Sequence, residues 1–95
     1  MDEARDTVAL QVRVEGRVQG VHYRASTQAQ ARLLGLNGWV HNCQDGSVEA
    51  VICGPERDIE AMLVWMAQGP PRAQVSALTR TPVTAPDNDD FEVRQ

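Results

Sequence analysis

The chain of 95 residues contains no lysine, and its nine cationic side chains are all arginine. Thirteen acidic residues outnumber them and give a net charge of −4. Because nucleic-acid-binding domains present a basic face, this balance argues against nucleic acid as a partner. Arg13, Arg17, Arg24 and Arg32 nevertheless lie close together in the sequence, which is compatible with a local positive site for an anion.

Long apolar runs are also missing. The longest is only a few residues, far short of the ~20 that cross a bilayer, so we expect no membrane segment. Residues 1–6 lack the basic and apolar segments of a signal peptide, and we expect them to form a flexible tail on a cytoplasmic protein. The length fits one domain, residues 1–95, and the content of 42% hydrophobic and 23% charged residues is typical of a globular fold.

Cysteine is scarce, and the two cysteines are not expected to pair. If Asp45-Gly46 is a two-residue hairpin turn, Cys43 lies opposite Val48 and Cys53 lies opposite Gly38. The two thiols are then separated by ~16 Å of strand, whereas a disulfide needs Cα atoms within ~7 Å. Free thiols are typical of a reducing cytoplasm.

Hydrophobic periodicity predicts the secondary structure. Alternating apolar residues predict strands over residues 8–14, 38–43, 47–53, 75–79 and 91–93, and apolar spacings of three and four predict helices over 22–34 and 55–68. The order β-α-β-β-α-β, followed by a short fifth strand, predicts an α+β ferredoxin-like (split βαβ) two-layer sandwich. We expect an antiparallel-rich sheet with both helices on one face.

This topology makes the first and second strands parallel, with the third strand between them. The end of the first strand, the start of the first helix and the end of the second strand then share one edge of the sheet. We therefore expect the loop 16–21, Arg24 and Asn42 to lie close together.

These three parts suit an anion. Gly16 and Gly20 allow main-chain N–H groups to approach a ligand, although a glycine-containing loop is also an ordinary turn. The guanidinium of Arg24 can hold two phosphoryl oxygens, although it is also compatible with a surface arginine. Asn42 can orient a water molecule but cannot act as a general base, and its alternative role is to flank the hairpin.

Two segments carry a family resemblance. Val14–Arg24 contains Gly-x-Val-Gln-Gly-Val-x-aromatic-Arg, and Gly38–Val48 contains Gly-x-Val-x-Asn followed by a turn and Gly-x-Val. Both resemble the signatures of the acylphosphatase family, and the similarity extends over nearly the whole chain. Two residues differ from the usual pattern. Tyr23 replaces a common Phe, which we expect to be neutral, and Cys43 replaces a Ser or Thr, so that a supporting hydroxyl is lost.

The resemblance implies the fold predicted above and a hydrolase that cleaves the carboxyl–phosphate mixed anhydride of acyl phosphates. It implies that Arg24 binds the phosphate and that Asn42 orients the attacking water. The phosphate cradle is then formed by Gly16, Arg17, Val18, Gln19, Gly20 and Val21. We expect a monomer with a small acyl phosphate as substrate, inorganic phosphate as product and inhibitor, and no cofactor or metal.

Other functions are weaker interpretations. A phosphate-binding or acyl-phosphate-binding regulatory module without turnover would need the same residues. RNA-binding domains with this strand order carry aromatics on the first and third strands, which this chain lacks. His41, Cys43 and Cys53 match no zinc spacing, and residues 41 and 43 face away from Asn42. His22 is expected to be structural or solvent-facing.

Overall fold

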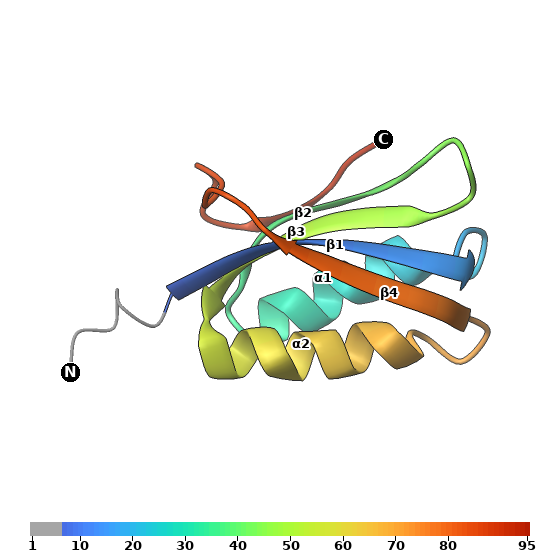
Figure 1. Ribbon diagram of the computed structural model, residues 1–95, viewed down its shortest axis with the longest axis horizontal. Helices are drawn as coiled ribbons and strands as arrows, with labels where there is room; N and C mark the ends of the chain where they lie inside the picture. The colour runs from blue at the N-terminus through green and yellow to red at the C-terminus, as the bar shows by residue number, and fades with distance from the viewer. Residues whose placement is uncertain (1–6) are drawn as a thin grey trace.

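The computed structural model describes residues 7–95, so the predicted tail at residues 1–6 lies outside the described residues. Two helices cover one face of a five-stranded sheet (Figure 1). The elements are β1 (Thr7–Arg17), α1 (Tyr23–Leu33), β2 (Asn37–Asn42), β3 (Val48–Pro55), α2 (Glu56–Gln68), β4 (Gln74–Pro82) and β5 (Phe91–Val93). The predicted ferredoxin-like α+β sandwich is therefore confirmed. Within the described part of the chain, no helix is long and apolar enough to cross a membrane.

The strands lie in the order β4-β1-β3-β2-β5. β3 pairs antiparallel with both β1 and β2, which makes β1 and β2 parallel to each other, as predicted. The short β5 adds a parallel edge strand beside β2. The loop after β1, the start of α1 and the end of β2 consequently meet at one edge of the sheet.

The core lies between the sheet and the helices. Val12, Val40 and Ile52 point from the sheet toward the helices and are completely buried, and Met62 and Met66 of α2 belong to the same buried cluster. Alternate strand residues such as Gln11 and Glu49 point to the other face of the sheet and remain partly exposed. The sheet therefore has one dry face and one face open to water.

The hairpin between β2 and β3 differs from the predicted register by one residue. Asn42, rather than Cys43, lies opposite Val48, and Cys53 pairs with Asn37 rather than Gly38. Both cysteines are free thiols, as predicted.

The cause of this difference is a three-residue turn at residues 44–46. The Cys43 N–H donates to the Ser47 carbonyl at 2.9 Å, and the Gly46 N–H donates to the Cys43 carbonyl at 3.2 Å. Gly46 has a φ of 95°, the left-handed geometry that ends such turns. Asp45 Oδ1 accepts hydrogen bonds from the Ser47 N–H at 3.0 Å and the Ser47 hydroxyl at 2.6 Å. These side-chain bonds favour the longer turn over the predicted Asp-Gly turn.

Candidate active site

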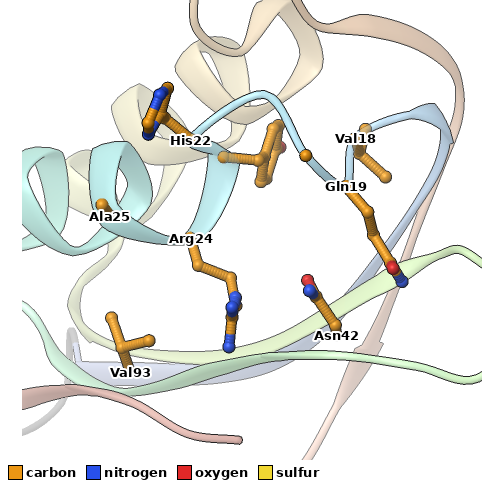
Figure 2. A pocket seen from close by; sticks show the side chains of 9 residues that line it. Val18, Gln19, His22, Arg24, Ala25, Asn42 and Val93 are labelled. Carbon is orange, nitrogen blue, oxygen red and sulfur yellow. The ribbon is translucent and has the colours of Figure 1, made fainter.

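A pocket of about 320 Å³ lies at the edge of the sheet where the three segments meet (Figure 2). Arg24 enters it from the first turn of α1 and Asn42 from the end of β2, and Figure 2 shows both side chains directed into the same space. The pocket is lined by Val18, Gln19, Gly20, His22, Tyr23, Arg24, Ala25, Asn42 and Val93. The predicted convergence of the loop, Arg24 and Asn42 is thus what the structure shows.

The predicted phosphate loop divides into two parts. Val18, Gln19 and Gly20 line the pocket, whereas Gly16 and Arg17 lie within β1 and pair with β4. Gly16 has a φ of 120° at a β-bulge, and a Cβ there would lie 2.1 Å from the Gln74 carbonyl oxygen. Close approach to β4 therefore accounts for this glycine.

Gly20 is the glycine that bends the loop at the pocket. Its φ is 74°, and nothing lies within 4 Å of the position that a Cβ would occupy. The flanking Val18 and Val21 are buried in the core and fix the ends of the turn. Only the backbone geometry, and no steric contact, thus calls for glycine here.

Gln19 has a role that the sequence did not reveal. Its side-chain amide donates to the Cys43 carbonyl at 2.8 Å and to the Ser47 carbonyl at 2.9 Å. These bonds tie the loop to the hairpin that carries Asn42. Gln19 therefore sets the separation between the two halves of the pocket.

Arg24 is held by the main chain near β5. Its Nη1 donates to the Arg94 carbonyl at 3.0 Å. The backbone N–H of Arg94 donates in turn to the Val40 carbonyl of β2 at 2.8 Å. The guanidinium of Arg94 lies 5.2 Å from the Trp39 ring centroid. Arg24 is thus positioned by a segment that is itself fixed to the sheet.

The residue before Arg24 anchors α1 to α2. Tyr23 is buried, and its hydroxyl donates to the Met66 carbonyl at 2.6 Å. In a helix the Met66 carbonyl would bond the N–H of residue 70, but Pro70 has none. Burial raises the pKa of Tyr23 well above its usual value, so the hydroxyl keeps its proton. The hydroxyl thus gives Tyr23 a hydrogen bond that Phe could not make.

His22 begins α1 without entering the pocket centre. It has a φ of 64°, and its carbonyl accepts the Ser26 N–H at 3.0 Å. Its ring is exposed and directed away from Arg24 and Asn42 in Figure 2. This placement agrees with the predicted structural or solvent-facing role.

The pocket is suited to an anion by its charge. None of its lining residues carries a carboxylate, although the chain as a whole is acidic, and Arg24 supplies a permanent positive charge. The first turn of α1 adds unpaired N–H groups and the positive end of the helix dipole. Asn42 offers both a donor and an acceptor at the opposite wall.

Comparison with known proteins agrees with this geometry. A model of the acylphosphatase family matches residues 10–93. The chain is 46% identical to an acylphosphatase of Azoarcus sp. strain BH72 over 97% of this chain and 95% of that one. It is 54% identical to an acylphosphatase of Rhodospirillum rubrum over 86% of this chain and 90% of that one. The solved structure of an acylphosphatase from Coxiella burnetii superposes with a TM-score of 0.93 at 37% identity, covering 99% of both chains. The chain belongs to the acylphosphatase family.

Proposed function

We propose that this chain hydrolyses acyl phosphates to a carboxylate and inorganic phosphate. The observation that carries the proposal is the shared pocket, in which Arg24 and Asn42 face one another from separate elements. A phosphoryl group needs neutralisation of its charge, and an attacking water needs orientation. The two side chains supply these functions from opposite walls.

Arg24 binds the phosphoryl group. Its guanidinium can donate two parallel hydrogen bonds to non-bridging oxygens, and the main-chain N–H groups of the loop at Val18–Gly20 and of the start of α1 supply further donors. Charge on these oxygens is thereby stabilised through the transition state. Positioning and electrostatics are the main sources of catalysis in phosphoryl transfer.

Asn42 orients the water. Its side-chain carbonyl accepts one water proton and so directs an oxygen lone pair at phosphorus, in line with the leaving group. The departing carboxylate has a conjugate acid with a pKa of ~4, so no general acid is needed to protonate it. The proposed step therefore uses no protein nucleophile: water forms the new P–O bond as the bond to the carboxylate oxygen breaks, and the protons of the water stay on the oxygens of the product phosphate.

Single substitutions separate the two roles. Arg24→Ala is expected to weaken competitive inhibition by phosphate and to lower kcat, whereas Asn42→Ala is expected to keep phosphate inhibition and lose about a hundredfold or more in kcat. The exposed Arg57 of α2 gives a matched control, because Arg57→Ala removes the same charge far from the pocket. Near wild-type turnover of benzoyl phosphate by Asn42→Ala contradicts the proposed role of Asn42.

The substrate class is tested by comparing several acyl phosphates with a phosphate monoester. Release of phosphate from the mixed anhydrides but not from the monoester supports the proposal. Binding of phosphate without turnover of any acyl phosphate would instead identify a non-catalytic phosphate-binding module. We also propose that the protein acts as a cytoplasmic monomer, which light scattering and fractionation test directly.

A further inference from the structure

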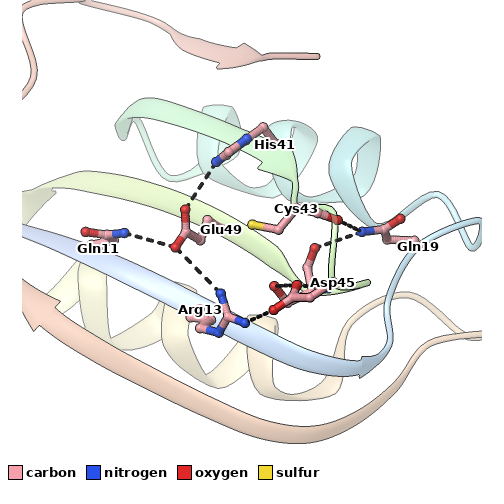
Figure 3. A network of polar contacts seen from close by, with 8 residues as sticks. Gln11, Arg13, Gln19, His41, Cys43, Asp45 and Glu49 are labelled. Carbon is pink, nitrogen blue, oxygen red and sulfur yellow. Dashed lines mark hydrogen bonds and ion pairs between the residues drawn. The ribbon is translucent and has the colours of Figure 1, made fainter.

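Three side chains of metal-binding type gather on the open face of the sheet, behind the pocket (Figure 3). His41 projects from β2, Cys43 follows at the end of the same strand, and Glu49 projects from the neighbouring β3. Asn42 lies between the first two and points to the opposite face, into the pocket. The cluster is therefore separate from the proposed active site, although it shares the same strand end.

The ligand atoms are close enough for one ion. The imidazole Nε2 of His41 lies 3.2 Å from Glu49 Oε1, and one ligand atom from each of the two side chains lies within 4.8 Å of the Cys43 sulfur. Tetrahedral zinc places its nitrogen, oxygen and sulfur ligands roughly 3.3–3.8 Å apart. The histidine–glutamate distance of 3.2 Å is close to the lower end of this range, and in Figure 3 the sulfur of Cys43 points toward Glu49. A rotation of these partly buried side chains would bring all three ligand atoms to bonding distance of one ion.

Neighbouring residues hold the carboxylate in a suitable orientation. Gln11 Nε2 donates to Glu49 Oε2 at 3.2 Å, and Arg13 Nη1 lies 3.8 Å from the same oxygen. Both contacts are made to Oε2 and leave Oε1 directed at His41. Arg13 also pairs with Asp45, so its charge is shared with a second carboxylate. Such outer contacts are typical of metal sites, where they orient the ligands.

We propose that His41, Cys43 and Glu49 bind one zinc-class divalent cation, with a water molecule in the fourth position. Imidazole and thiolate favour Zn²⁺ over the harder Mg²⁺ and Ca²⁺, which prefer oxygen ligands. The thiolate and carboxylate together carry two negative charges and balance those of the cation. All three side chains are only partly buried, which leaves a path for the ion.

The register of the hairpin explains why the sequence did not indicate this site. A two-residue turn would have placed Glu49 opposite Asn42, on the face of the pocket. The three-residue turn places it opposite His41 instead. Since paired residues in adjacent strands share a face of the sheet, this shift of one residue creates the cluster.

Zinc binding is measured by calorimetry on the reduced full-length chain. The coordination geometry of the bound metal is measured by the absorption spectrum of the Co²⁺ form. We expect one Zn²⁺ per chain, together with a sulfur-to-cobalt charge-transfer band and intense tetrahedral d–d bands. At a hundredfold excess of free Zn²⁺ over Kd, the melting temperature should rise by about 10 °C or more. Zn²⁺ should also protect Cys43 from alkylation.

The chain offers a matched control for two of the ligands, since it contains two cysteines and two histidines. Cys43→Ala, His41→Ala and Glu49→Gln should each weaken Zn²⁺ binding more than about tenfold, the loss typical even of outer-shell changes. Cys53→Ala and His22→Asn should leave it unchanged. Absence of stoichiometric binding, or equal affinity in Cys43→Ala and Cys53→Ala, overturns the proposal. None of these readouts depends on hydrolysis of an acyl phosphate.

Discussion

Removal of one oxygen atom, by Tyr23→Phe, tests how α1 is fastened to the rest of the fold. The phenyl ring remains and keeps its contact with Trp65, whose ring centroid lies 5.9 Å away. The Met66 carbonyl, however, loses the hydroxyl that bonds it at 2.6 Å. Because Pro70 has no N–H, the helix itself provides no replacement donor.

The magnitude follows from burial. Tyr23 is only 1% exposed, so water does not readily reach the orphaned carbonyl. Leaving a buried acceptor unsatisfied costs about 1–3 kcal/mol of unfolding free energy. For a domain of this size, each kcal/mol lowers the melting temperature by ~4–8 °C. We therefore expect a fall of at least about 4 °C in thermal denaturation and a lower urea midpoint with an unchanged m-value.

The pH dependence gives a second, independent readout. The raised pKa of buried Tyr23 means that the folded protein retains this proton above pH ~10, where an unfolded tyrosine loses it. Stability should therefore fall as pH rises above ~10, by up to about 1.4 kcal/mol per pH unit until the folded pKa is reached. Tyr23→Phe should lack this component. Both proteins contain the same two cysteines, so the difference between their pH profiles isolates the contribution of Tyr23 from ionisation of the thiols.

Ultraviolet absorbance follows the ionisation directly, since the chain has a single tyrosine. Tyrosinate should not appear near pH 10 as long as the protein stays folded. Ionisation near pH 10 in the folded protein, or equal melting temperatures of wild type and Tyr23→Phe, would refute the reasoning.

Three further predictions concern the loop and the hairpin. Gln19→Ala should raise KM for benzoyl phosphate and lower kcat with little effect on melting temperature, because two hydrogen bonds that place the loop are lost; unchanged kinetics would contradict this. Gly16→Ala should destabilise the protein by more than about 1 kcal/mol, because the added Cβ would lie 2.1 Å from the Gln74 carbonyl oxygen. Chemical denaturation measures this change in unfolding free energy. An unchanged stability would show that β4 can shift to make room for the methyl group. The pKa of Asp45 is lowered to about 2, first by hydrogen bonds from the Ser47 hydroxyl and N–H and then by Arg13. The contribution of Asp45 to stability should therefore be present above pH ~4 and be lost as the pH drops toward 2. In Asp45→Asn, stability measured over this pH range should change less with pH.

Much of the fold was predictable because its signals are local. Alternation along β1 and the apolar spacing of α2 each identify one element, and the order of the elements then leaves few topologies. The convergence of Arg24 and Asn42 followed from that topology. The second helix begins at Glu56, one residue after the predicted Pro55, as expected for boundaries that depend on capping.

The remaining features depend on contacts between distant segments. The Asp-Gly pair indicated a two-residue turn, but the bonds of Asp45 to Ser47 stabilise a longer one. The tie from Gln19 to the hairpin and the bond from Tyr23 to Met66 each span more than twenty residues. No local pattern marks such a partner, and the pairing of His41 with Glu49 depends on a register that only the complete turn determines.

The bond from Arg24 to the Arg94 carbonyl has a consequence for affinity. A free arginine side chain carries ~2 kcal/mol of rotamer entropy, which a ligand must overcome when it immobilises the group. Here part of that ordering is completed when the chain folds, and the remaining guanidinium nitrogens stay available to a ligand. An anion thus meets an arginine that is already partly ordered, so its capture should require less rearrangement of that side chain.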